Sequence, residues 1–320
     1  MKKICIILLA FVLIVSMAAC GTQESGSGGQ QNTGGSQTPA SSSTTEPAAP
    51  APELSIAIDD WPVVDGATAF LPYYTGVAAK ALGVSEEEAR QYILCSTTDF
   101  AYPNLADGKA DLIFCLLPSD DQVAYAKDAG VTFETEPVLN EAFVFFVNKD
   151  NPVDELSIQQ LHDIYAGKIT NWKEVGGNDE RIIAYQRSEG SGSQTGLYLH
   201  VIPQDEVMEP PTEERIADMG GIVDAVAGYD NASGALGYSY NYFVVNQHYD
   251  EQIKLLKING VYPGNDTIAS GEYPMISQAC AVFRSDEPED SVVRQIAAWC
   301  QSDEGQKLAK EKNYVPSQTN

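Results

Sequence analysis

The fold class is decided by one stretch of the chain, Arg181-Ile-Ile-Ala-Tyr-Gln-Arg-Ser-Glu-Gly-Ser-Gly-Ser-Gln-Thr195, which continues into Leu197–Ile202. Its first six residues have an apolar, partly β-branched centre, which predicts a strand over 181–186. Glycine and hydroxyl residues follow, and the apolar positions after them predict a helix. A strand, a Gly/Ser turn and a helix in this order are the repeating unit of an α/β protein.

The same alternation continues on both sides of this stretch. A helix is predicted over Phe70–Leu82, and two capping boxes, at Ser85 and Ser157, predict the starts of two more. We therefore expect an open α/β sheet, in which ligands bind where the carboxyl ends of strands lead into helices. The other predicted strands are 54–58, 92–95, 110–117, 141–148 and 237–240.

Three strand-to-helix junctions resemble one another, Asp65–Ala69, Ser96–Asp99 and Arg187–Thr195. A helix start offers unpaired N–H groups and a positive dipole end, and glycine lets the backbone approach a ligand closely. An arginine adds a fork of donors that matches an oxyanion. The candidate ligand-binding residues are Ala67, Thr68, Ala69, Thr97, Thr98, Arg187, Ser191, Gly192 and Ser193.

Each junction also has an ordinary structural explanation. Thr68 and Thr98 are typical helix N-caps, and a Gly-Ser-Gly-Ser run is usually a loop. Arg187 stands immediately before that run, between a predicted strand and a predicted helix, and this favours an anion site. Asn171-Trp172 and Gly237–Tyr240 are expected to be structural, as a turn with a core aromatic and as a strand.

Composition limits the classes of partner. The chain has 45 acidic and 19 basic residues and a formal net charge of −26, which argues against nucleic acid. A buried anion site is still compatible, because it acts through local dipoles and hydrogen bonds. With three histidines and no Cys-x-x-Cys, we expect neither a metal site nor a cofactor. The sequence leaves open how Cys95, Cys115, Cys280 and Cys300 pair, if they pair.

The N-terminal region predicts export. Lys2 and Lys3 precede an uncharged apolar run, and Met17-Ala-Ala-Cys20 resembles a bacterial lipobox. We expect a signal peptide over 1–19, lipidation of Cys20, and a disordered Gly/Ser/Thr/Pro tether over 20–52. The alternative is ordinary signal cleavage with an incidental cysteine. The first interpretation predicts a protein held by its lipid anchor at the extracytoplasmic face of the cell membrane.

Beyond these features, the chain resembles PstS-like phosphate-binding proteins of ABC transporters over nearly all of residues 54–316. The resemblance implies a two-lobed periplasmic-binding-protein type 2 fold with two crossovers and a ligand cleft between the lobes. It places lobe 1 at 53–141 plus 275–320 and lobe 2 at 142–274. It further implies a monomer that delivers phosphate or a similar small oxyanion to an ABC transporter permease. The matching segments are Leu156–Trp172, Arg187–Ser193, Gly234–Tyr238, Ile258–Pro263 and Gly271–Pro274.

One position departs from this family. Its phosphate specialists carry an Asp after the strand that here covers 111–117, and Leu116 stands in that place. The resemblance assigns to that Asp the acceptance of a proton from hydrogen phosphate and the rejection of sulfate. Asp99 or Asp120 would have to supply the carboxylate instead, or the ligand is another small oxyanion.

Two further functions belong to other classes. A sensor or adhesin could keep the fold without transport. A secreted hydrolase could use Ser191 or Ser193, but the sequence has no Gly-x-Ser-x-Gly elbow and no histidine in a motif that would activate a serine. We therefore expect a binding protein and not an enzyme.

Overall fold

The structure is a computed structural model that describes residues 54–228 and 233–317. The predicted signal peptide (1–19), the predicted lipidation site Cys20 and the predicted tether (20–52) lie outside the described residues. Within the described ranges, no helix has both the length and the apolar character needed to cross a membrane.

The centre of the fold is a mixed sheet with the strand order β1-β2-β11-β3-β8-β5, in which β9 and β12 also pair with β3. The pairs β1–β2 and β5–β8 are parallel, whereas every strand that pairs with β3 is antiparallel to it. The strands of this sheet are β1 (Val64–Gly66), β2 (Leu112–Leu116), β3 (Phe133–Asn148), β5 (Ile183–Ala184), β8 (Ala235–Tyr240), β9 (Ile253–Leu255), β11 (Ile276–Arg284) and β12 (Val315–Pro316). Two short parallel pairs stand apart from it, β4 (Glu155–Leu156) with β10 (Lys257–Ile258) and β6 (Gln186–Arg187) with β7 (Arg215–Ile216).

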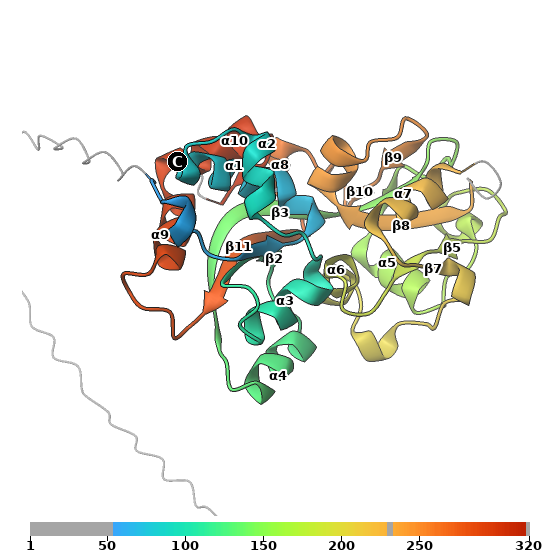
Figure 1. Cartoon of the computed structure of the whole chain (residues 1–320). Helices are drawn as coiled ribbons and strands as arrows, with labels where there is room; N and C mark the ends of the chain where they lie inside the picture. Colours follow the sequence, from blue (N-terminus) through green and yellow to red (C-terminus); the bar gives the residue numbers. More distant parts are fainter. Residues whose placement is uncertain (1–53, 229–232, 318–320) are drawn as a thin grey trace, which may run out of the picture. The chain divides into compact units, whose positions relative to one another are not determined.

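The long strand β3 belongs to both parts of this sheet. Its residues up to Ala142 pair with β11, and from Phe143 onward it pairs with β8 and β9. Figure 1 shows β3 running from the side of β2 and β11 to the side of β8. Residues 141–148 are all buried, as expected for a strand that is covered on both faces. β3 therefore joins two halves, one built on β1, β2 and β11 and the other on β5, β8 and β9.

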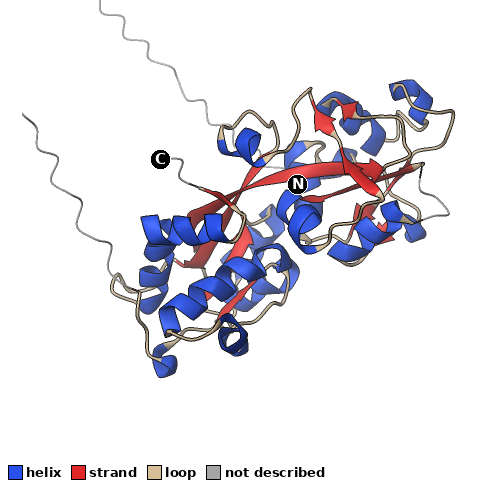
Figure 2. Cartoon of the chain, turned by 90° about the horizontal axis from the view of Figure 1, so that it is seen from above, coloured by secondary structure: helices blue, strands red, loops and turns tan. Residues whose placement is uncertain are grey.

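Helices lie on both sides of the strands, as the view from above shows (Figure 2). The predicted helix starts are found where local chemistry favours them, with a complete capping box at Ser157 and a Ser85 side chain that accepts from Glu88 N–H. The α-helices are α1 (Leu71–Leu82), α2 (Glu86–Ala89), α3 (Thr98–Ala106), α4 (Asp120–Asp128), α5 (Ile158–Tyr165), α6 (Gly192–His200), α7 (Met219–Ala227), α8 (Asn265–Ala269), α9 (Val292–Gln301) and α10 (Asp303–Glu311). The shorter helical turns are η1 (Ile58–Asp60), η2 (Thr68–Phe70), η3 (Arg90–Tyr92), η4 (Trp172–Val175), η5 (Gln204–Glu206), η6 (Thr212–Glu214) and the π-helical η7 (Phe243–Gln247).

Three predicted strands were wrong or incomplete. Residues 54–57 form no strand; instead, the N–H of Ile56 donates to the carbonyl of Ala81 at the end of α1. The strand predicted at 92–95 is reduced to a single bridge between Ile93 and Val64. The strand predicted at 181–186 is broken into β5 and β6, because the chain leaves β8 after Tyr185 and pairs with β7 instead.

The four cysteines of the described part are free thiols in the structure, and three of them are buried. Cys115 on β2 stands directly opposite Cys280 on β11. Asn171 and Trp172 have the structural roles predicted for them. The Asn171 side chain caps η4, and the Trp172 ring is buried with its N–H donating to the Gly234 carbonyl over 2.9 Å.

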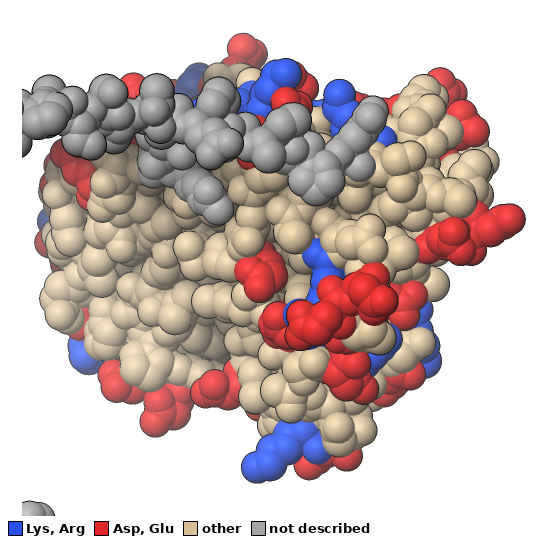
Figure 3. Space-filling view, turned by 90° about the vertical axis from the view of Figure 1, so that its left-hand side faces the viewer, with Lys and Arg blue, Asp and Glu red and all other residues tan. Residues whose placement is uncertain are grey.

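The acidic composition is visible on the molecular surface. Figure 3 shows one face on which Asp and Glu side chains gather in clusters, with fewer Lys and Arg side chains among them. An acidic face of this kind repels other polyanions, including nucleic acids.

Candidate functional site

A cavity of about 270 Å³ brings together all nine residues that the sequence predicted for the site. They come from three separate segments of the chain, 67–69, 97–98 and 187–193, and meet where β1, β6 and the turn before α3 lead into helices. The other residues that line this cavity are Phe70, Asp99, Leu116, Ala217, Asp218, Met219, Gly220, Tyr240 and Phe243. We call this space the site cavity.

Four helix starts face the site cavity. η2 begins at Thr68, α3 at Thr98, α6 at Gly192 and α7 at Met219, and each of these residues lines the cavity. The first N–H groups of a helix have no partner within the helix and carry the positive end of its dipole. Together the four starts bring N–H donors to one space, which suits an anion without a cluster of basic side chains, although the Asp218 carboxylate caps α7 and compensates the dipole of that helix.

Arg187 is held rigidly beside these helix starts. Its side chain is buried, with Nε donating to the Ile216 carbonyl over 3.0 Å and Nη2 donating to the Ala217 carbonyl over 3.1 Å. Burial lowers the pKa of Arg187, and the nearby Tyr238, Asp218 and Asp99 offset that effect. A guanidinium stays charged in proteins, and three of its five N–H donors make no hydrogen bond to the described residues. Those donors are free for an oxyanion.

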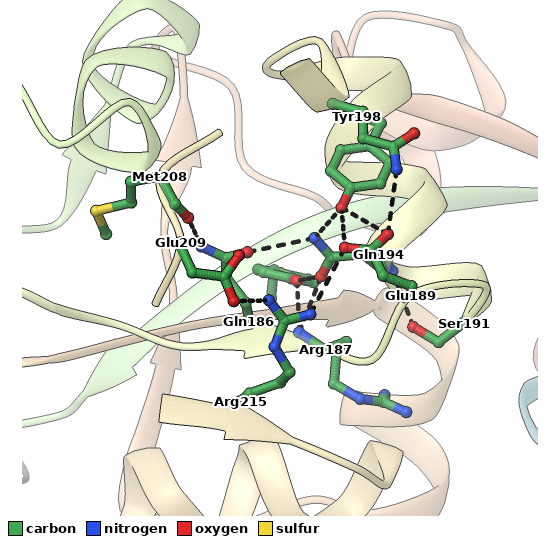
Figure 4. A network of polar contacts seen from close by, with 11 residues as sticks. Gln186, Arg187, Glu189, Ser191, Gln194, Tyr198, Met208, Glu209 and Arg215 are labelled. Carbon is green, nitrogen blue, oxygen red and sulfur yellow. Dashed lines mark hydrogen bonds and ion pairs between the residues drawn. The ribbon is translucent and has the colours of Figure 1, made fainter. Parts of the chain in front are cut away.

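The backbone at Arg187 is anchored by a buried polar network, which Figure 4 shows from close by. The Gln194 side-chain oxygen accepts from Arg187 N–H over 2.9 Å and also from the Tyr238 hydroxyl. Gln194 Nε2 donates to the Tyr198 hydroxyl over 2.9 Å, and that hydroxyl donates to the Glu189 carboxylate. In Figure 4 the Arg187 guanidinium points away from this network. The network therefore fixes the loop before α6 and leaves the charged group outside it.

The loop before α6 ends in a helix cap. The Ser191 hydroxyl caps α6 by accepting from Gln194 N–H over 3.2 Å. Thr68 and Thr98, for which the sequence suggested a capping role, are instead the first residues of η2 and α3, and neither helix has a side-chain cap. The hydroxyl proton of Ser191 is still available as a donor to a ligand. Ser193 is buried, and its Oγ has no partner among the described residues. A bound acceptor would satisfy it.

Thr97 carries backbone strain at this site. Its φ is 69°, in the left-handed region that β-branched residues rarely adopt. Conformations of this kind cost about 1–3 kcal/mol and persist where the surrounding structure holds them. Thr97 is the residue before α3, so the strain turns the chain sharply into the helix start at Thr98.

Of the two carboxylates that could replace the expected Asp, Asp99 lines the site cavity, whereas Asp120 lies exposed at the start of α4 and does not. Asp99 Oδ1 is buried and has no hydrogen-bond partner in the described part of the chain. Burial raises the pKa of Asp99, and the charge of Arg187 counteracts this. Leu116 also lines the cavity, as its position at the end of β2 predicts.

Several cavity residues were missed by sequence reasoning. Tyr240 was taken as an ordinary strand residue, and Phe243 and Met219 were not considered. Tyr240 ends β8 and Phe243 follows it, and both reach the cavity because β8 pairs with the second part of β3. Met219 reaches it because α7 follows β7, which pairs with β6 beside Arg187. The local pattern encodes neither long-range pairing. Asp218 carried a usable signal, since its side chain caps α7 by accepting from Gly221 N–H over 2.7 Å.

The lining of the site cavity contains two carboxylates, Asp99 and Asp218, but none of the side chains that most often activate a serine. It contains no histidine, and no lysine. His200 contacts the Ser277 hydroxyl over 2.7 Å, and His162 and His248 contact carboxylates elsewhere. Among the described residues, no group of three or more His, Cys, Asp or Glu side chains is placed to hold a metal ion. The arrangement can bind and orient an oxyanion through a cation, helix starts and hydroxyls.

Comparison with known proteins gives a consistent picture. A family model described as "PBP superfamily domain" matches residues 56–304. The phosphate-binding protein PstS of Bacillus subtilis is 27% identical over 172 residues, which are 53% of this chain and 53% of that protein. The chain thus matches about half the length of this curated relative.

Two solved structures share the fold. A candidate phosphate ABC transporter substrate-binding protein from Clostridium perfringens, solved with bound phosphate, has a TM-score of 0.64 and 21% identity over 82% of this chain and 100% of its own. An ABC-type phosphate transport receptor from Vibrio cholerae has a TM-score of 0.60 and 22% identity over 79% of this chain and 98% of its own. These likenesses confirm the predicted two-lobed α/β architecture.

Proposed function

The chain belongs to the PBP superfamily, and from this premise we propose that it captures inorganic phosphate in the site cavity and delivers it to an ABC transporter. The observation that carries the proposal is the convergence of Arg187 and four helix starts on one cavity. Hydrogen bonds between charged groups and dipoles of this kind are the strong ones in protein sites. The names of the relatives, which are phosphate-binding and phosphate-transport proteins, support the same ligand.

We place the lobes around β3. The proposed first lobe is 53–141 plus 275–320, and the second is 142–274. Support comes from the change of partner along β3, which pairs with Ile276 at Ala142 and with Tyr240 at Phe143. With this division, Thr68 and Thr98 belong to one lobe and Arg187 to the other, so the ligand would contact both.

We further propose that the protein acts as a monomer at the extracytoplasmic face of the membrane, held by a lipid on Cys20. The basic start, the apolar run and the small residues before Cys20 support this. We propose a binding role and not catalysis, because the lining of the site cavity holds no histidine or lysine that could activate Ser191 or Ser193.

Isothermal titration of the folded protein with inorganic phosphate tests the proposal, with a panel of other anions run by thermal shift. We expect saturable binding of one phosphate for each chain and a rise in the melting temperature, because a ligand that binds only the folded state stabilises it. A folded protein that binds another anion of the panel but not phosphate would disprove phosphate as the ligand.

A further inference from the structure

A second cavity, of about 320 Å³, lies against the site cavity. Four residues, Thr98, Leu116, Gly192 and Tyr240, line both cavities, so the two spaces share a wall. Arg187 and the starts of η2 and α7 line only the site cavity, whereas the second cavity extends to the first residues of β11 and along α6 as far as Leu199. A ligand larger than a single oxyanion would extend in this direction.

The shared wall is thin. Gly192 has no side chain, and a β-carbon placed there would lie 3.0 Å from Thr98 Oγ1 and 3.7 Å from Leu116 Cδ1. The wall therefore consists of the side chains of Thr98, Leu116 and Tyr240 around the bare backbone of Gly192. Leu116 is the apolar and rotatable part of it, and a leucine can move to another rotamer without leaving a polar atom unpaired.

The second cavity is lined by neutral residues. Its lining contains no Asp, Glu, Lys, Arg or His, and the exposed Leu117 and Leu199 add apolar surface where it opens to solvent. A charge moved from water into such a cavity would lose its hydration without a partner. The lining therefore suits a neutral group and disfavours a cationic or anionic one.

Gln122 gives this cavity one directional polar group. Its side-chain oxygen accepts from Ser119 N–H over 2.9 Å in the capping box of α4, which fixes the orientation of the amide. Gln122 Nε2 is then left without a partner among the described residues, although the side chain is almost fully buried. A buried amide donor that lacks an acceptor is unfavourable, so an oxygen on a ligand would relieve it.

We propose that the second cavity holds the neutral, oxygen-bearing substituent of a monosubstituted phosphate, a phosphate monoester or phosphonate whose anionic head occupies the site cavity. This proposal rests on the proposed oxyanion site. Leu116 contacts the substituent where an acidic residue would otherwise meet a fourth phosphate oxygen. Gln122 donates to an oxygen of the substituent.

The test compares three probes by competition titration, namely inorganic phosphate, glycerol 3-phosphate and phosphoethanolamine. We expect the folded protein to bind glycerol 3-phosphate at least as tightly as inorganic phosphate. Phosphoethanolamine should bind at least about tenfold more weakly than glycerol 3-phosphate, because its ammonium group would enter a neutral cavity.

The variant Gln122→Glu makes the test specific. Glutamate keeps the capping-box acceptor but replaces the amide donor by a negative charge. We expect Gln122→Glu to weaken the binding of glycerol 3-phosphate by about tenfold and to tighten the binding of phosphoethanolamine. The affinity for inorganic phosphate should stay unchanged. Gln295→Glu, on α9 and outside both cavities, is the matched control and should change none of the three affinities.

The outcomes separate this inference from the proposed function. Binding of inorganic phosphate without competition by glycerol 3-phosphate overturns the inference and leaves the proposed function standing. Binding of glycerol 3-phosphate without inorganic phosphate supports the inference and overturns the proposed ligand. If a folded Gln122→Glu protein binds the three probes in the same order of affinity as the wild type, the second cavity does not contact the ligand and the inference is overturned. If none of the three probes binds, both proposals are overturned.

Discussion

Asp99 on α3 and Arg187 on β6 line the same cavity although they are far apart in the sequence, and the positive charge of Arg187 favours the ionised form of the Asp99 carboxylate against the effect of burial. An anion between them would meet donors on one side and an acceptor on the other. This pair sets both the affinity and the selectivity that we expect of the site.

Arg187→Ala should weaken phosphate binding by at least about tenfold, since a charge-assisted hydrogen bond contributes about 1.5–3 kcal/mol. Isothermal titration measures the affinity, and circular dichroism checks that the variant is folded. Lys173→Ala is the control for removing one positive charge, because Lys173 is exposed and pairs with Asp179 outside the cavity. Equal losses in both variants would mean that Arg187 acts through net charge and not through contact.

Asp99→Asn should reduce the preference for phosphate over sulfate by about tenfold or more, because hydrogen phosphate brings a donor that the Asp99 carboxylate accepts, whereas sulfate brings only acceptors. Competition titrations of the two anions measure this preference. Asp120→Asn is the matched control at an exposed carboxylate and should leave the preference unchanged. If selectivity survives both substitutions, another group discriminates between the anions.

Glu141→Gln should remove a component of the pH dependence of stability. Glu141 is buried where β3 changes partners, and its Oε1 accepts from Ala142 N–H over 2.8 Å and from Tyr242 N–H over 3.2 Å. Burial raises the pKa of Glu141 from 4.5 to about 7, against the lowering effect of these hydrogen bonds. The protonated form is thus favoured by the fold.

The raised pKa determines how the stability changes with pH. The contribution of Glu141 to stability is fully present below about pH 4.5 and is lost as the pH rises through about 7, an effect on the order of 3 kcal/mol. Urea denaturation at pH 5 and pH 8 should therefore show a smaller fall in the free energy of unfolding for Glu141→Gln than for the wild type. The exposed Glu251→Gln should behave as the wild type. A parallel fall in all three proteins would assign the pH dependence to other groups.

Thr97→Gly should stabilise the fold by about 1 kcal/mol, because glycine adopts a φ of 69° without the strain that a β-branched residue carries there. Thr170→Gly is a control at a residue without a positive φ and should destabilise. Urea denaturation measures the free energy of unfolding of both variants and of the wild type. A loss of stability at position 97 would show that contacts of the Thr97 side chain outweigh its backbone strain.

Cys20→Ser should move the protein from the membrane fraction to the medium, since it removes the sulfur that the lipid would occupy. Fractionation and immunoblotting of cells that express the two forms measure this. Ser41→Ala, a substitution in the predicted tether, is the control and should stay with the membrane. A Cys20→Ser protein that stays membrane-bound and uncleaved would contradict lipidation.

The sequence was most informative about the part of the candidate site that one short segment of the chain supplies. The loop from Arg187 to Ser193 combines its cation, glycines and helix start within seven consecutive residues, so its chemistry could be recognised without the fold. The same holds for Thr68 and Thr98, which stand at helix starts that the structure contains. The sequence offered Asp99 and Asp120 as alternative sources of the missing carboxylate, but only the fold shows that Asp99 is the one that lines the cavity.

Features that depend on long-range pairing were not predicted. Tyr240 lines both cavities because β8 pairs with the second part of β3, and nothing in the Gly237–Tyr240 pattern indicates that contact. The missing strand at 54–57 has a similar cause, since Ile56 bonds to the end of α1 and not to a neighbouring strand. Alternating apolar residues favour a strand only if a partner edge is available.

The position of β11 between β2 and β3 has a consequence for how the chain is made. β2 and β3 are synthesised early, but the strand that joins them comes from residues 276–284, near the end of the chain. Until those residues are available, both strands present unpaired edges, which are prone to non-native pairing. The half of the sheet that contains β2 and β11 therefore closes last, and the chain stays incompletely folded until its final segment has been added.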